Sequence, residues 1–539
     1  MTDPFVAGVV FVFTIITFCL YSIVVRERDI KSRPPGPKGV PVLGNIRDFP
    51  PKGVPEFKHW LLHKDLYGPM SSVRVLGQTI ILIHDRDAAH EVLTKSSSKT
   101  SDRPASEFAT NLCGYDRLFV LRGDDKRFRR CRKLVHQHLG TKTTAAKFDH
   151  DQNLATHQLL LRLLTDPDGL FNHVGQHSSG TVLRITYGYT ISETKKDPLV
   201  ALIDCSSHQL GQAGVPGAWT VDIIPALKYL PSWFPGAGFQ KTAKQFRKVA
   251  EQMANVPYRF VQQHMASGTH KESFVSGLIK QLREETTQCE TLTARDEDEI
   301  KSTAAVMYLA GAETIVTAIR VFILCMILYP EVQREAQEEI DRVLGPNQLP
   351  SASDLESLPY IDALVKESYR WSPAVPLGLA HCTSEELWYD GYTIPKGAII
   401  MPAVWYFLHD PHVYDTPDRF DPSRFLEPRN QRDPRSDVFG YGRRQCPGRF
   451  LAHTFLFLTF AQILASFDIR KAVDEQGRDM DVKLELGSGI GCFPKEHPYA
   501  ITPRSEAHAD MIRRVAAGRL NKAADTDYLH VEAILQEWE

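Results

Sequence analysis

The 539-residue sequence has almost no excess charge of either sign, because 63 lysines and arginines stand against 65 aspartates and glutamates. This balance gives no reason to expect nucleic acid as a partner. The nine cysteines include no C-x-x-C pair, which argues against a zinc ribbon or a dithiol redox motif. Their odd number and scattered positions favour a reducing compartment. No N-x-S/T sequon occurs, as suits a body that stays outside the secretory lumen.

Charge is also missing from residues 5–25, which are almost all apolar. A helix of this length crosses the ~30 Å hydrocarbon layer of a bilayer. Arg26, Arg28 and Lys31 follow at once, so the positive-inside bias places the N-terminus in the lumen and the rest in the cytosol. A cleaved signal peptide is the alternative, but it needs a basic start and a small-residue cleavage site, and neither is present. We predict a transmembrane signal anchor over residues 1–25.

The rest of the chain divides by composition. Residues 26–41 are basic and proline-rich, which predicts a stiff, non-helical linker. Residues 42–504 show mostly helical periodicity, with short β-like pieces only in the N-terminal quarter and the C-terminal third. The expected fold class is therefore mainly α with small β-sheets. Residues 505–539 form a polar tail to which the sequence assigns no chemistry.

Several elements are predicted individually. A long helix begins near Thr293 with an acidic first turn and stops at Pro330. Another occupies residues 331–344, and a cap at residues 351–354 precedes a helix that carries Glu367 and Arg370. Strands are expected at residues 387–392 and 398–401, around the turn at residues 394–397. An apolar helix is expected over residues 449–467.

Residues 439–448, FGYGRRQCPG, carry the strongest chemical signal. Their glycines allow a tight turn beside a flat cofactor. Pro447 suits the first turn of the apolar helix that follows, which places Cys446 at the positive end of that helix and stabilises a thiolate. Arg444 is placed to pair with an acidic group of the cofactor. A buried structural cysteine in a glycine-rich loop is the alternative.

The centre of the long helix reads Ala-Gly-Ala-Glu-Thr over residues 310–314. Its small residues leave space for a diatomic ligand, and Glu313 and Thr314 can relay protons. The alternatives are a core stripe, because Ile300, Ala304 and Met307 share the helical face, and a threonine bonded only to its own helix.

These two segments resemble the cytochrome P450 family. The haem-binding pattern F-x-x-G-x-R-x-C-x-G is matched at Phe439, Gly442, Arg444, Cys446 and Gly448. The nearest resemblance is to microsomal fungal members of the O-methylsterigmatocystin oxidoreductase-like type. It implies the cytochrome P450 fold, haem b with Cys446 as the iron ligand, and an endoplasmic reticulum membrane location with the catalytic domain on the cytosolic face.

The same resemblance assigns further roles. Gly311, Glu313 and Thr314 correspond to the oxygen-activating A-G-x-D/E-T segment. Arg132 and His381 correspond to propionate contacts, although Phe128 replaces the tryptophan that shares this task in the family and cannot donate a hydrogen bond. A buried cluster is implied for Glu367, Arg370 and Arg424, with Ser423 in place of the usual glutamate. The substrate pocket is expected to be lined by Phe108, Leu112, Phe119, Met307, Ala310, Val375, Leu377 and Ile490.

The function implied is a haem-thiolate monooxygenase that inserts one oxygen atom from O2 into a lipophilic small molecule. Electrons would come from NADPH only indirectly, through NADPH-cytochrome P450 reductase, with cytochrome b5 as a second candidate donor. The basic cluster at residues 127–133 is either solvated surface or the reductase contact. Residues 221–239 are either core or a membrane contact. Two rival functions stay open: an O2-independent isomerase or dehydratase, against which Glu313 and Thr314 argue, and a non-enzymatic haem sensor or electron carrier.

Overall fold

The computed structural model describes residues 33–41, 43–51, 53–192, 197–215, 218–285, 292–487, 489, 491–517 and 524–528. The expected anchor and the pocket candidate Ile490 lie outside these residues. The linker from Pro34 to Pro41 is non-helical where it is described, and it contacts the sheet because the Ser72 hydroxyl donates to the Pro34 carbonyl at 2.6 Å.

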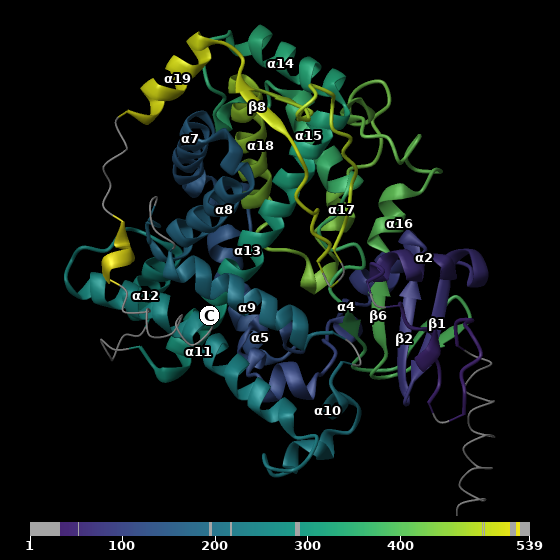
Figure 1. Ribbon diagram of the computed structural model, residues 1–539. Coiled ribbons are helices and arrows are strands. Elements are labelled where there is room, and N and C mark those ends of the chain that lie inside the picture. Colours follow the sequence, from purple (N-terminus) through teal and green to yellow (C-terminus); the bar gives the residue numbers. More distant parts are fainter. Residues whose placement is uncertain are drawn as a thin grey trace, which may run out of the picture.

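Helices make up most of the protein, as the periodicity predicts, and they pack around one long central helix (Figure 1). The larger helices are α2 (Glu56–Tyr67), α5 (Lys126–Leu139), α7 (Asp149–Thr165), α8 (Leu170–Tyr187), α9 (Pro198–Ala213), α11 (Gly238–Ala266), α12 (Phe274–Glu285), α13 (Ala294–Leu328), α14 (Pro330–Leu344), α15 (Pro359–Trp371), α18 (Arg449–Ser466) and α19 (Glu506–Ala516). Shorter ones are α3 (Arg86–His90), α4 (Ser97–Thr100), α6 (Lys142–Ala145), α10 (Thr220–Ile223), α16 (Val404–His409) and α17 (Arg435–Val438).

Helix α13 begins where its sequence signals place the start. The Thr293 hydroxyl accepts from the Asp296 N–H, and the Asp296 carboxylate accepts from the Thr293 N–H, which forms a capping box. The helix ends before Pro330, which opens α14. Of all the described helices, α13 and α18 are long and apolar enough to cross a bilayer, but both are mostly buried inside the protein. They are the central helices of the core.

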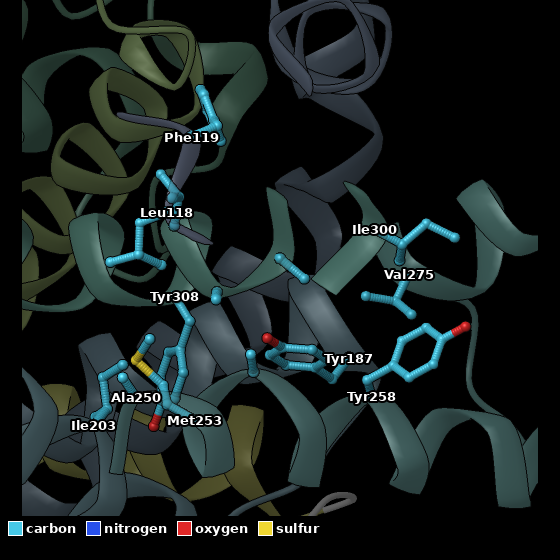
Figure 2. Packing of buried hydrophobic residues seen from close by; sticks show 14 of the residues in the cluster. Leu118, Phe119, Tyr187, Ile203, Ala250, Met253, Tyr258, Val275, Ile300 and Tyr308 are labelled. Carbon is cyan, nitrogen blue, oxygen red and sulfur yellow. The ribbon is translucent and has the colours of Figure 1, made fainter. Parts of the chain in front are cut away.

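The apolar faces of these helices form two large clusters. One joins α5, α8, α9, α11 and α12 to the first half of α13, and Figure 2 shows part of it, with Tyr308 of α13 beside Ile203 of α9 and Met253 of α11. The other joins the second half of α13 to α15 and α18. Since both clusters share α13, this helix fixes the position of everything that packs on it.

A four-stranded sheet, at the lower right in Figure 1, has the order β1-β2-β6-β3. Its strands are β1 (Met70–Val75), β2 (Gln78–Ile83), β6 (Ile399–Pro402) and β3 (His381–Cys382). Strands β2 and β6 are parallel, and the other pairs are antiparallel. Strands β7 (Phe467–Arg470) and β8 (Ala500–Pro503) form a separate antiparallel pair.

The prediction of one strand over residues 387–392 is wrong. The chain forms β4 (Leu387–Tyr389) and β5 (Tyr392–Ile394), which pair with each other. Asp390 and Gly391 both have positive φ, at 47° and 78°, so they make a two-residue hairpin turn. The Asp-Gly pair is the usual signal for such a turn, and the sequence reading overlooked it.

The segment that follows α10 is exposed. Ile224, Tyr229, Trp233 and Phe234 retain 49%, 79%, 80% and 44% of their accessible surface. The alternative that this segment belongs to the core is therefore wrong for these side chains. They leave an apolar surface at the lower edge of Figure 1.

Candidate active site

The cysteine loop connects α17 to α18 and closes on itself, because the Cys446 N–H donates to the Phe439 carbonyl at 2.7 Å. Gly442 has φ of 51°. A Cβ on Gly442 would lie 2.5 Å from the carbonyl oxygen of Leu93, so only glycine fits there. The predicted tight turn is present, and it packs against the segment that leads into α4.

The Cys446 side chain is half-buried three residues before α18 starts at Arg449. Burial raises the pKa of the Cys446 thiol, while the Gly448 N–H and the nearby charges of Arg132 and Arg449 lower it. These donors and cations favour the thiolate once a metal compensates its burial. Pro447 precedes the N-cap Gly448, so it belongs to the turn before the helix and not to the helix's first turn, a correction to the sequence reading.

Arg444 provides the sharpest test of whether a haem fits this loop. Its guanidinium is buried and donates to the Ser101 carbonyl at 2.7 Å and to the Arg122 carbonyl at 2.5 Å. Its Nη1 is buried and has no hydrogen-bond partner among the described residues. A buried cationic N–H without a partner is costly, and a propionate oxygen would satisfy it. The residues present therefore fit the cofactor.

Phe128 has a use that the sequence reading missed. Its ring lies under Arg444, with 3.6 Å between the guanidinium carbon and the ring centroid. The aromatic face thus supports the cation, although it cannot donate to a propionate. Arg132, one turn further along α5, donates to the Gln445 carbonyl and so contacts the loop beside Cys446.

His381 is 3% exposed in β3, so it is a buried histidine and not a surface group. Its Nδ1 lies 2.8 Å from the Thr100 carbonyl. Burial lowers the pKa of His381 to about 3, and the charge of Arg103 adds to this. The imidazole is therefore neutral and donates from Nδ1. A propionate contact through Nε2 stays a prediction.

Ala310 and Thr314 are exposed in the middle of α13, between buried residues such as Ala305 and Ile315. The Thr314 hydroxyl donates to the Ala310 carbonyl at 2.8 Å. This is the bond within the helix that the sequence left open as the alternative use of Thr314, and it leaves the hydroxyl oxygen able to accept a further hydrogen bond. An alcohol on the exposed stretch of a core helix is suitably placed to act on a ligand.

Gly311 faces a different neighbour. A Cβ on this residue would lie 3.2 Å from the Val182 side chain of α8. Close packing of α8 on α13 therefore explains the glycine. Its predicted role as space for a diatomic ligand stays a prediction.

Glu313 is half-buried and points toward α9, which the sequence reading did not associate with it. Burial raises the pKa of Glu313, the nearby Ser207 hydroxyl of α9 lowers it, and the charge of Asp204 raises it. A half-buried carboxyl whose pKa is raised, beside polar side chains of α9, is a group suited to proton transfer. No local motif marks α9, so only the folded structure shows this pairing.

The predicted Glu-Arg-Arg cluster is confirmed. Arg370 donates two bonds to Glu367, at 2.7 and 2.8 Å, and Arg424 donates a third at 3.1 Å. All three side chains are fully buried. The carboxylate comes from α15, so Ser423 replaces the family's glutamate without removing the negative charge.

Some predicted pocket residues do not reach open space. Phe108 and Phe119 are 0% and 3% exposed, and Phe108 stacks on Trp219 with 3.5 Å between ring centroids. Met307 and Val375 are partly exposed, as a lining requires. In the described chain, no three His, Cys, Asp or Glu side chains form a metal site. Cys446 is the residue that would hold the iron of a bound haem.

A buried arginine with a free N–H lies beside a half-buried cysteine, and the exposed stretch of α13 carries an acid and an alcohol. These features fit the class of haem-thiolate enzymes. The comparisons agree with this class. The family model described as Cytochrome P450 matches residues 34–496. The chain belongs to the cytochrome P450 family.

Curated relatives cover nearly the whole chain. It is 46% identical to Cytochrome P450 monooxygenase CLM2 of Gibberella zeae, over 92% of this chain and 94% of that protein. It is 42% identical to Multifunctional cytochrome P450 monooxygenase af510 of Aspergillus fumigatus, over 94% of each chain. It is 38% identical to O-methylsterigmatocystin oxidoreductase of Aspergillus flavus, over 91% of this chain and 92% of that protein. The predicted monooxygenase class and fungal type are confirmed, and the family implies haem iron.

Proposed function

We propose that this chain hydroxylates a lipophilic small molecule in fungal secondary metabolism, with haem b held by Cys446 and electrons supplied by NADPH-cytochrome P450 reductase. The unpartnered Nη1 of Arg444, close to the Cys446 loop, is the observation that carries this proposal. Haem supplies the activation of dioxygen, which amino-acid side chains do not provide. Cys446 would ligate iron, while Arg444, Arg132 and His381 would hold the propionates.

Proton delivery is the task of α13. One oxygen atom enters the substrate and the other leaves as water, which consumes two protons and two electrons. Glu313, whose pKa is raised by its burial, is the proposed proton carrier, and Asp204 and Ser207 of α9 lie beside it. The Thr314 oxygen, fixed by its bond to Ala310, faces the open side and passes the proton on.

The Thr314→Ala variant tests this relay. It should keep the haem spectrum of the parent protein, while product formed per NADPH oxidised falls roughly tenfold or more and hydrogen peroxide rises instead. Coupling is measured with purified protein, reductase and a substrate found by spectral-shift screening. Thr303→Ala is the matched control, because Thr303 makes the same type of backbone bond on the same helix but is fully buried. Unchanged coupling in Thr314→Ala would remove Thr314 from the relay.

The reductase contact is assigned to one face of α5. Most arginines of this region are already paired, since Arg127 contacts Asp298 at 2.6 Å and Arg130 contacts Asp296 at 2.5 Å. Lys126 and Lys133 are exposed along the helix, as is Arg129, which pairs with Asp124 at 2.8 Å. Arg132, the residue before Lys133, contacts the cysteine loop. An acidic flavoprotein docked there would lie close to the iron's thiolate side.

Reversing two charges on this face should weaken docking. We expect Lys126→Glu combined with Lys133→Glu to raise the reductase concentration needed for half-maximal turnover about tenfold at low salt, with little change at saturation. Lys396→Glu, an exposed lysine in the turn after β5, is the control. If the double variant and Lys396→Glu changed the required reductase concentration equally, this face of α5 would not be the reductase contact.

Membrane attachment follows from two apolar segments. Residues 1–25 are proposed to span the endoplasmic reticulum membrane, and the exposed Tyr229, Trp233 and Phe234 to rest on its cytosolic face. Cytochrome b5 is proposed as the alternative electron donor on the same face of α5.

A further inference from the structure

A short segment near the C-terminus lies against the connection between α8 and α9 (Figure 1). The Thr190 N–H donates to the Asp525 carboxylate at 2.8 Å, and the Asp525 N–H donates back to the Thr190 carbonyl at 3.0 Å. Asp525 is 7% exposed. The segment, described from Ala524 to Tyr528, follows residue 496, where the match to the family model ends. Two distant parts of the chain are thus joined by a reciprocal pair of bonds.

A lysine from a third segment completes this junction. Lys271 Nζ lies 2.7 Å from the Asp525 carboxylate and 2.6 Å from the Thr190 hydroxyl. The backbone at Lys271 also contacts Gly188, where a Cβ would lie 2.7 Å from the Lys271 carbonyl oxygen. Gly188 has φ of 70° and ends α8. The ion pair is partly shielded from water, which makes it more than a surface contact.

Thr526 extends the contact to the start of α9. Its hydroxyl donates to the Asp197 carboxylate at 3.0 Å, and the Tyr189 hydroxyl donates to the same oxygen at 2.9 Å. Asp197 is the N-cap of α9 and accepts from the Leu199 N–H at 2.9 Å with its other oxygen. The orientation of this cap therefore depends on the C-terminal segment.

The start of α9 is connected in turn to the oxygen-activating helix. The buried Tyr308 of α13 donates to the Leu199 carbonyl at 3.0 Å, and Figure 2 shows its ring beside Ile203. Further along α9, Asp204 and Ser207 lie next to Glu313. A displacement of the first turn of α9 would consequently move the groups that face Glu313.

We propose that Ala524–Tyr528 is a strap, with Asp525 and Thr526 as positioning residues that hold α9 against α13. The strap limits displacement of α9 from α13 and so keeps Asp204 and Ser207 beside Glu313. Its catalytic consequence rests on the proposed function, whereas its effect on α9 does not. Without the strap, α9 moves away from α13 more often, so ligands enter and leave faster. Proton delivery through Glu313 is then less efficient, and less product forms per NADPH oxidised.

Hydrogen–deuterium exchange on the full-length protein tests the mechanical part. In the Asp525→Ala, Thr526→Val double variant, we expect the backbone amides at the start of α9, residues 199–202, to exchange at least about tenfold faster. The reason is that the Thr526 bond to the Asp197 cap is lost together with the Asp525 bonds to Thr190 and Lys271. Lys271→Met should act in the same direction without any change in the tail. Asp510→Asn is the control, since it removes an exposed ion pair with Arg513 in the preceding helix. Unchanged exchange at α9 in both test variants would overturn the strap.

The kinetic part uses 4-phenylimidazole as a probe that binds haem iron. The double variant should bind and release 4-phenylimidazole severalfold faster, at nearly unchanged affinity. Equal rates in the variant and the parent protein would overturn the proposal that the strap limits the displacement of α9. The experiments distinguish failure of the proposed function from failure of the strap. If the protein holds no thiolate-ligated haem, the proposed function fails while the exchange result still decides whether the strap exists.

Discussion

Cys446→Ser should reduce monooxygenase turnover to background, a loss of at least ~10³-fold, as expected for a residue that acts directly on the reacting centre. Serine matches the cysteine in shape, and the Cys446 N–H bond to the Phe439 carbonyl can persist. A hydroxyl, however, does not donate electron density to iron as a thiolate does. We expect folded protein that has lost the thiolate signature of its carbon monoxide complex, measured by the reduced difference spectrum.

Cys382→Ser is the matched control, because Cys382 is another half-buried cysteine, in β3 next to His381. It should keep turnover within about twofold, as is usual for a substitution outside the chemistry. Normal turnover in Cys446→Ser would show that another group ligates the iron, and the account of the site would be wrong.

Glu367→Gln should have the largest effect on folding. The variant leaves Arg370 and Arg424 as buried cations without a carboxylate between them. Removing one partner of a buried ion pair costs roughly 3–5 kcal/mol. Because the cluster joins α15 to the segment that leads into the cysteine loop, haem retention should fall together with the melting temperature. Thermal unfolding and the haem-to-protein ratio measure both.

Glu331→Gln provides the comparison. Glu331 pairs with Arg419 at 3.5 Å, and both side chains are largely exposed, so the expected change in stability is at most ~1 kcal/mol. If Glu367→Gln were as stable as Glu331→Gln, the cluster would not be the structural lock that its geometry indicates.

Elements with strong local signals could be predicted from the sequence. The capping box at Thr293 marks the start of α13, and Pro330 marks its end. The burial of the Glu367 and Arg370 pair was predicted from the family resemblance, because the three-residue spacing alone only places both on one helical face, where a solvated ion pair is usual. The strand error at residues 387–392 was avoidable, since the turn residues Asp390 and Gly391 are themselves the signal.

Contacts between distant segments could not be predicted in this way. The approach of α9 to Glu313 depends on how the two helices pack, and no spacing within either sequence encodes it. The contact between the Phe128 ring and Arg444 could not be predicted either. In the sequence, phenylalanine at this position shows only that the hydrogen-bond donor of the family's tryptophan is missing. The junction of Asp525 with Thr190 joins residues 335 positions apart, in a tail whose composition carries no motif.

The central claim, that Cys446 ligates iron, is tested most directly by X-ray absorption at the iron edge of the purified, haem-loaded protein. One sulfur neighbour of iron, present in the parent protein and absent in Cys446→Ser, is the predicted result. An iron in the parent protein surrounded only by nitrogen and oxygen would contradict it.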